Sequence, residues 1–323
     1  MGRFIAVRSL HMAITLFAMV TLMFFMFRLL PGDPTMTTIS PALYPKAQAA
    51  MKAQFGLDRP LFEQYLLYLA NVARLDFGLS FVTSRSVAEV MQGRLVNTVV
   101  LILPSMILAY ALGVLIGAML AWRRGGRMEV GIVFLATALQ AAPVFWLGMM
   151  AIFVFSITLD LFPVGHIVTP GRFPDPTWRM YFTTDFLHHL VLPFAVHTAY
   201  QLCFPLLLMR SSMLSTMHDD FIELARMKGL TERRILFHHA MRNSLLPVAT
   251  TIPMILGWAV AGSVVIETVF SWPGLGRLMV ESVEASDFPV VQASFFLIAL
   301  LTVLGTFVAD LMYGMLDPRI VYR

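Results

Sequence analysis

Charged side chains are scarce in this chain of 323 residues. Asp, Glu, Lys and Arg make up 13% of it, about half of the roughly 25% that is typical of soluble domains. Hydrophobic residues make up 58%, and the mean hydropathy is +0.77. This composition excludes an ordinary soluble enzyme and indicates a surface that mostly faces lipid. The net charge of +4 is too small and too scattered to indicate nucleic-acid binding.

Cysteine is almost absent as well. Cys203 is the one cysteine, which excludes an internal disulfide and a cysteine-rich metal site. It lies in an apolar run, so we expect a buried thiol. Methionine, by contrast, occurs 23 times. Because methionine is a flexible filler of protein cores, a methionine-lined metal path is the lesser alternative, and we predict no metal site.

The sequence motifs of the common hydrolases and of ATP-binding proteins are missing too. The histidine pairs at 188–189 and 238–239 belong to no H-E-x-x-H motif, and the sequence contains no G-x-S-x-G, so we predict no catalytic residues. It also contains no G-x-x-x-x-G-K-[ST] phosphate loop. The chain is therefore expected not to be an enzyme, and any ATP hydrolysis would need a separate polypeptide.

Long apolar runs are what the sequence does have. A bilayer crossing takes about 20 mostly apolar residues, and six runs are long enough: about 9–30, 97–122, 130–158, 188–212, 246–269 and 289–313. The first follows Arg3 and Arg8, as in a signal peptide, but its apolar run is too long and no small-x-small cleavage site follows it. We expect a retained anchor.

Basic residues at the ends of the runs predict the orientation, because short cytoplasmic loops are enriched in Lys and Arg. They gather at 3–8, 123–127, 210–242 and 319–323, whereas the opposite short loops carry only Arg172, Arg179 and Arg277. The fold class expected is an all-α polytopic membrane protein with six transmembrane helices and both termini in the cytoplasm. Segment 31–94 would then lie outside.

The outer segment has its own helical pattern. The stretch PKAQAAMKAQFGL predicts a short helix that ends at Gly56, and a second helix is expected to begin at Pro60. The second has apolar residues at helical spacing: Leu61, Tyr65, Leu69 and Val72. Two interpretations are open. The helices pack against the spans, or they present a docking face to an external partner.

The most polar stretch, DDFIELARMKGLTERRILFHHAMRN at 219–243, lies between the fourth and fifth runs. Asp220 and Glu223 match a capping box with Asp in the place of Ser or Thr, and Gly229 is a natural helix stop. The pattern predicts a helix of about nine residues, ~13 Å long. One face would carry Phe221, Leu224 and Ala225, and the last turn Arg226 and Lys228. The helix either lies at the membrane surface or docks on a partner.

Several motifs carry a family resemblance. ELARMKG at 223–229 resembles the Glu-Ala-Ala-x-x-x-Gly (EAA) signature of binding-protein-dependent ABC importer permeases, with Leu224 departing from it. HAMRN at 239–243 resembles the peptide/nickel branch. Further matches are RLLPGDP at 28–34, FGLDRPLFEQYLLYL at 55–69, LDFGLS at 75–80, ETVFSWPGLGRLM at 267–279, DFPVVQA at 287–293 and DLMYGMLDPRI at 310–320. The resemblance is to the B-type permease of dipeptide and oligopeptide importers.

The resemblance implies a type I ABC importer fold in a bacterial or archaeal cell (inner) membrane. Residues 1–94 would form the first transmembrane helix and an extracytoplasmic helical segment, and 95–323 a five-helix core with a cytoplasmic coupling loop at 213–245. The partners implied are a second, non-identical permease, two cytoplasmic ATPases, an extracytoplasmic binding protein and membrane lipid, without nucleic acid. ATP and magnesium would bind to the ATPases, and this chain would hold no cofactor.

Residue roles follow from the same resemblance. The coupling helix would use Asp219, Asp220, Phe221, Glu223, Leu224, Ala225, Arg226, Lys228 and Gly229. Residues that could line the translocation path are His197, Gln201, Trp258, Ser263 and Glu267. Hydrogen bonds between helices would equally explain the first two, and Glu267 could instead anchor the turn that follows it.

The transported solute is not evident from the sequence. Dipeptides or oligopeptides are expected, and nickel or another small solute is the alternative within the family. A secondary transporter is a further alternative, and it would normally place paired ionisable residues in mid-span. Asp310 and Glu267 are instead expected near span ends, which disfavours that alternative.

Overall fold

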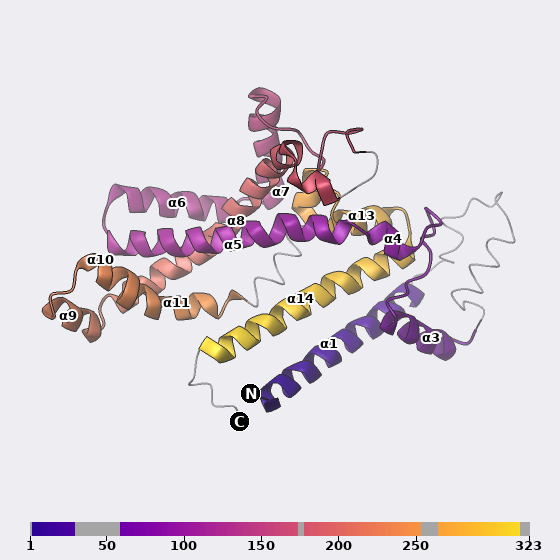
Figure 1. Ribbon diagram of the computed structural model, residues 1–323, viewed down its shortest axis with the longest axis horizontal. Helices are drawn as coiled ribbons and strands as arrows, with labels where there is room; N and C mark the ends of the chain where they lie inside the picture. Colours follow the sequence, from indigo (N-terminus) through magenta and orange to yellow (C-terminus); the bar gives the residue numbers. More distant parts are fainter. Residues whose placement is uncertain (1, 30–58, 174–177, 253–263, 317–323) are drawn as a thin grey trace. The chain divides into compact units, whose positions relative to one another are not determined.

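The computed structural model describes residues 2–29, 59–173, 178–252 and 264–316 (Figure 1). Within these ranges the regular elements are helices, and the only β pairing is the isolated bridge between Leu79 and Ser86. The chain divides into two compact units. Unit 1 comprises Met1–Thr98, Pro273–Leu311 and Pro318–Arg323, and unit 2 comprises Val99–Trp272 and Met312–Asp317.

The helices of unit 1 are α1 (Gly2–Leu29), α3 (Leu61–Ala73), α4 (Val87–Met91), α13 (Leu275–Glu284) and most of α14 (Phe288–Leu316). Helix α5 (Arg94–Trp122) begins in unit 1 and continues through unit 2. Unit 2 also contains α6 (Arg127–Ala141), α7 (Val144–Ala151), π-helix η1 (Ile152–Thr158), 3-10 helix η2 (Trp178–Phe182), α8 (Thr184–Thr216), α9 (Asp220–Met227), α10 (Glu232–Arg234), π-helix η3 (Ile235–Ala240) and α11 (Met241–Ala249). Residues 264–269 are helical as well.

Four of the predicted spans are confirmed as helices that are long and apolar enough to cross a membrane. They are Ile5–Phe27, Val87–Trp122, Thr184–Thr216 and Phe288–Val308. The fifth predicted span, 246–269, includes residues 253–263, which lie outside the described residues. The total of six spans and the cytoplasmic position of the termini therefore stay predictions.

The third predicted span, 130–158, is not one continuous helix. It consists of Arg127–Ala141 and Val144–Thr158, bent by 107° at the break. Pro143 explains the break, because a proline ring disfavours helical backbone at the residue before it. Ala142 accordingly has ψ of 139°, an extended value. The two helices together still qualify as one broken span.

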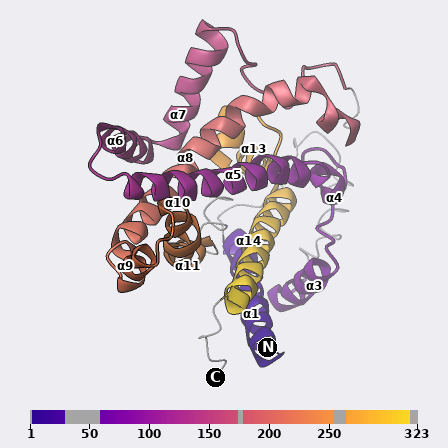
Figure 2. The same cartoon turned by 60° about the vertical axis from the view of Figure 1, so that its left-hand side comes forward.

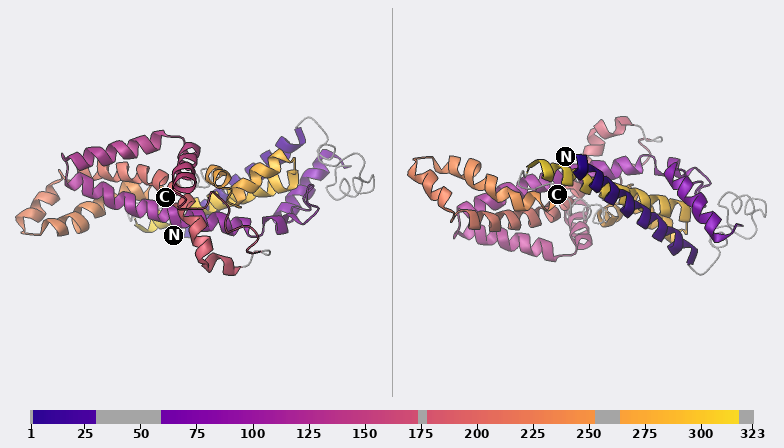
Figure 3. Two further views of the ribbon diagram at one scale, coloured as in Figure 1. Left: turned by 90° about the horizontal axis from the view of Figure 1, so that it is seen from above. Right: turned by 90° about the horizontal axis from the view of Figure 1, so that it is seen from below.

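In unit 1, helix α3 packs on α1. The hydroxyls of Tyr65 and Thr21 lie 2.7 Å apart, and the ring of Phe24 lies 5.2 Å from that of Tyr65. The helix predicted to begin at Pro60 is thus confirmed, and part of its apolar side packs within the unit. Helices α1 and α14 run side by side in the views of Figure 3, and Val20 shares a buried cluster with Phe296. The helix predicted to end at Gly56 lies outside the described residues.

A buried carboxylate joins two segments of unit 1 that lie far apart in the sequence. Asp287, just before α14, accepts hydrogen bonds from the backbone N–H of Phe81, at 2.9 Å, and from the Ser80 hydroxyl. Burying a carboxylate is costly unless donors surround it. The two bonds therefore fix the turn around residues 78–86 against the start of α14.

In unit 2, helices α5 and α8 approach each other closely at two glycines. A Cβ added at Gly117 would lie 2.4 Å from the Leu206 carbonyl oxygen, and one at Gly113 would lie 2.8 Å from the Pro205 ring. Small residues at such spacing let helix backbones meet. Cys203 on α8 is fully buried, as expected.

Candidate functional site

Helix α9 lies at the end of unit 2 where α5 and α6 are joined (Figure 2). Its N-cap is Asp219, with extended backbone at φ −76° and ψ 143°, and no side chain caps the helix by a hydrogen bond. Asp220 is therefore the first helical residue, and the predicted capping box is wrong. The acids Asp220 and Glu223 still lie in the first turn, where the partial positive charge of a helix N-terminus favours them.

The end of α9 follows the prediction. Gly229 has φ of +73°, a left-handed conformation that glycine adopts without steric cost. Its N–H donates to the Arg226 carbonyl at 2.9 Å, and the Leu230 N–H donates to the Ala225 carbonyl at 3.3 Å. This pair of bonds is a Schellman motif. A Cβ at Gly229 would meet no atom within 4 Å, so only the backbone conformation requires glycine.

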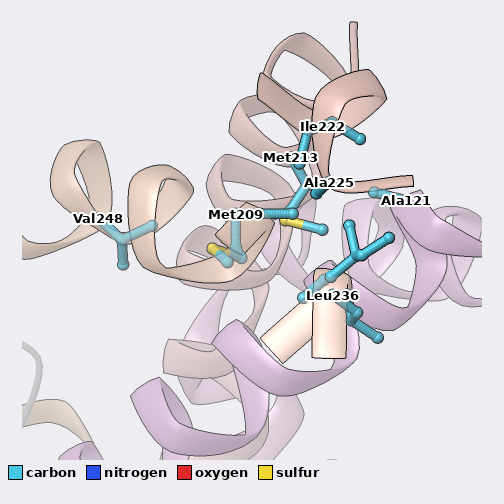
Figure 4. Packing of buried hydrophobic residues seen from close by; sticks show 10 residues of the cluster. Ala121, Met209, Met213, Ile222, Ala225, Leu236 and Val248 are labelled. Carbon is cyan, nitrogen blue, oxygen red and sulfur yellow. The ribbon is translucent and has the colours of Figure 1, made fainter. Parts of the chain in front are cut away.

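One face of α9 is buried in the chain's own core. Ile222 is 1% exposed and Ala225 is 5% exposed. They belong to a buried cluster drawn from α5, α8, α9, η3 and α11 (Figure 4). Its members are Ala118, Ala121, Met209, Met213, Ile222, Ala225, Ile235, Leu236, Ala240 and Val248. We call this set the loop core.

The opposite face of α9 points to solvent. Leu224 is 51% exposed and Met227 is 74% exposed, and the charged side chains of Asp220 and Glu223 are exposed beside them. We call these four residues the outer face of α9. The predicted apolar face of Phe221, Leu224 and Ala225 is therefore wrong, since Leu224 lies on the other side. Apolar side chains at the centre with charged ones beside them match the arrangement of a protein contact, which has an apolar core and a polar rim.

Arg226 fixes the orientation of α9. Its Nε donates to Glu232 Oε1 at 3.0 Å and its guanidinium lies 5.8 Å from the centre of the Trp122 ring. An exposed ion pair contributes little stability, but these two contacts tie α9 to α10 and to the end of α5. Lys228, the C-cap residue, is exposed.

The helices behind the loop core are joined by polar contacts as well. The Ser212 hydroxyl on α8 donates to the Ser244 carbonyl on α11 at 3.0 Å. The Ser244 hydroxyl in turn donates to Thr216 Oγ1 at 2.9 Å. Because α9 packs on this joined set, a force on its outer face would reach α5 and α8 through side chains in direct contact.

The predicted path residues have different surroundings. His197 is buried, and its Nδ1 lies 2.7 Å from Ser105 Oγ on α5, while its Nε2 lies 3.4 Å from Gln201 Nε2. A hydrogen bond between helices, which was the alternative explanation for His197, is thus present.

Glu267 is fully buried, and its carbonyl accepts the Trp272 N–H at 2.8 Å. Trp258 and Ser263 lie outside the described residues, and contact with a solute stays a prediction for all five.

Two family models cover most of the chain. Residues 113–322, which include α9 and its loop core, match the binding-protein-dependent transport system inner membrane component family. Residues 1–102 match the N-terminal part of binding-protein-dependent transport system membrane components. The chain belongs to this family. The family resemblance is thereby confirmed, and the coupling role of residues 223–229 stays a prediction.

This permease is similar over its whole length to curated relatives. It is 36% identical to the oligopeptide transport system permease protein AppB of Bacillus subtilis (strain 168), covering 100% of both chains. It is also 36% identical to the dipeptide transport system permease protein DppB of Escherichia coli (strain K12), covering 98% of both. The glutathione transport system permease protein GsiC of Salmonella choleraesuis (strain SC-B67) is 34% identical, with 100% of both chains covered. The resemblance to B-type peptide permeases is confirmed.

Sequence reasoning about the permease missed Ile222, the most buried residue of α9. The sequence does not indicate which side of α9 is buried. Four neighbouring residues are all apolar (Phe221, Ile222, Leu224 and Ala225), and at helical spacing more than one pair of them could form the buried face. The neighbours on α5, α8 and η3 decide which face is buried.

Proposed function

We propose that this chain is a permease subunit of an ATP-driven importer and forms half of a translocation pathway. The solutes would be dipeptides, oligopeptides or similar small molecules, delivered by an extracytoplasmic binding protein. The names of the full-length relatives support this class, since they specify oligopeptide, dipeptide and glutathione transport. The remaining partners would be a second, non-identical permease and two cytoplasmic ATPases, which bind the ATP and magnesium.

The observation that carries the proposal is the contrast between the buried face and the exposed face of α9. Ile222 and Ala225 are buried in the loop core, whereas Leu224 and Met227 are exposed on the other side. A helix built only to close a loop would gain nothing from holding Leu224 and Met227 in water. The outer face of α9 would seat in a groove of an ATPase.

The mechanism follows from these contacts. ATP binding would draw the two ATPases together and displace α9. The loop core would pass that displacement to α5 and α8, because interiors packed at crystal density shift as units. The spans would then alternate between an inward-facing and an outward-facing arrangement. The chain's own residues perform no bond chemistry in this cycle.

The test is to change the outer face without touching the loop core. Leu224→Asp combined with Met227→Asp should weaken association with the ATPase subunits by about 30-fold or more, the loss expected when central contact residues are removed. Val164→Asp is the matched control, because Val164 is also an exposed apolar residue but lies in the loop after η1. The measurements are co-purification of the ATPases and uptake of a labelled dipeptide in proteoliposomes. Assembly and uptake at wild-type levels in the double variant would contradict the proposal.

A further inference from the structure

An apolar groove runs along the outside of unit 2, between α5, α6 and α8. It has a volume of about 340 Å³. Helices α5 and α6 run alongside each other from the turn that joins them (Figure 1). The described residues that line the groove are apolar with one exception, Arg123. The groove is distinct from α9 and plays no part in the proposed docking of an ATPase.

Buried apolar residues form the floor of the groove. They are Leu120, Ala136, Cys203 and Leu206. The side walls are open to the surroundings, since Met119, Met128 and Leu135 are exposed. A groove with this apolar lining suits a flexible hydrocarbon chain better than a polar solute.

The mouth of the groove is positively charged. Arg123 follows α5 directly, and neither its side chain nor that of Arg127 makes a hydrogen bond or ion pair with any residue that the structure describes. The carboxylate of Glu129, two residues after Arg127, is occupied by Arg210 and by the backbone N–H of Gly125. The mouth therefore keeps a net positive charge.

The residue beside the mouth is of a type that favours the level of lipid headgroups. Trp122 ends α5, and tryptophan is enriched where a membrane helix meets water. Basic pockets between membrane helices at this level attract anionic headgroups. A protein partner could also cover an apolar groove. The combination of an apolar groove with a basic mouth, however, matches a single molecule that has an apolar chain and an anionic group.

We propose that this groove binds an anionic phospholipid. One acyl chain lies in the groove, and the headgroup phosphate pairs with the Arg123 guanidinium. Arg127, at the start of α6, adds to the positive field at the mouth. No relative's name and no motif assigns a lipid site to this part of the chain.

The proposal is tested by lipid titration of the full chain, purified in detergent with the subunits that accompany it. Native mass spectrometry counts bound dioleoyl-phosphatidylglycerol and dioleoyl-phosphatidylcholine. Arg123→Gln should weaken binding of the anionic lipid about fivefold, the effect of one cation near a membrane surface, and leave the neutral lipid unchanged. Arg124→Gln is the matched control. It removes the same charge one residue away, where the guanidinium contacts His218 Nε2 at 3.3 Å.

Two further probes separate the parts of the ligand. Dihexanoyl-phosphatidylglycerol has the same headgroup but short chains, so it should bind markedly more weakly than the dioleoyl lipid. Inorganic phosphate should displace neither. The proposal is overturned if Arg124→Gln acts as strongly as Arg123→Gln, or if phosphatidylcholine binds as tightly as phosphatidylglycerol. An Arg123-dependent site that exists in the isolated chain and vanishes in the assembled complex would also overturn it, because a protein partner would then cover the groove.

Discussion

Gly229 has a conformational role in this chain that no other amino acid fills as well. Its φ of +73° completes the Schellman motif that ends α9, and the space around its Cα is open. Any side chain would fit sterically at the Cβ position, so the only demand is on the backbone. A substitution at position 229 therefore tests the backbone conformation alone, without a change in side-chain packing.

We expect Gly229→Val to cost roughly 1–3 kcal/mol of local strain, because a β-branched residue resists left-handed backbone. The end of α9 would shift, and association with the ATPases would weaken. Gly229→Asn is the matched control, since asparagine tolerates this conformation. The measurements are ATPase co-purification and dipeptide uptake. Equal behaviour of the Val and Asn variants would show that the left-handed turn is not required.

At the scale of elements, Gly113 and Gly117 bring α5 very close to α8. Gly117 allows the Leu206 carbonyl to lie where a Cβ would be. The same two helices are bridged by Ser105 and His197. Since the loop core includes residues of both helices, their spacing also determines where α9 sits.

Gly117→Ala should destabilise the permease by about 1–3 kcal/mol, the usual cost of overpacking, because the obstructing atom is a backbone oxygen that cannot rotate away. Gly131→Ala on α6 is the matched control. It is also a helical glycine, but an added Cβ there meets nothing within 4 Å, and alanine should favour the helix by about 0.5–1 kcal/mol. Thermal unfolding in detergent, followed by size-exclusion chromatography, distinguishes them. A Gly117→Ala variant as stable as wild type would show that the helices separate at little cost.

At the scale of the whole molecule, the proposed function requires partners. The sequence contains no phosphate loop, and the outer face of α9 carries the exposed apolar side chains of Leu224 and Met227. The function proposed above therefore belongs to an assembly and not to this polypeptide alone.

Purified alone and reconstituted in liposomes, the chain should hydrolyse no ATP above background and take up no labelled dipeptide. Addition of the ATPases, the second permease and the binding protein should establish both activities together. An ATPase variant with the phosphate-loop lysine replaced by alanine serves as the control, and it should assemble without restoring uptake. Nucleotide hydrolysis by the chain alone would contradict the separation of roles.

Much of this protein follows from the sequence by itself. Low charge and long apolar runs predicted the membrane helices that are described, and the motifs at 223–229 and 267–279 predicted the family. The left-handed turn at Gly229 was also predictable, because it depends on local backbone sterics. Such features need no distant neighbour, so local physical chemistry is sufficient for them.

The tertiary structure alone decided which apolar residues point inward. Lipid-facing and core-facing side chains are equally apolar in a membrane protein, so hydropathy does not distinguish them. Ile222 is buried and Leu224 is exposed because α5, α8 and η3 meet one side of α9. In the same way, a proline such as Pro143 is compatible with a kink in a helix, but only the packed structure fixes the 107° bend between the two helices beside it. Direction in space depends on contacts between residues far apart in the chain, which no local pattern contains.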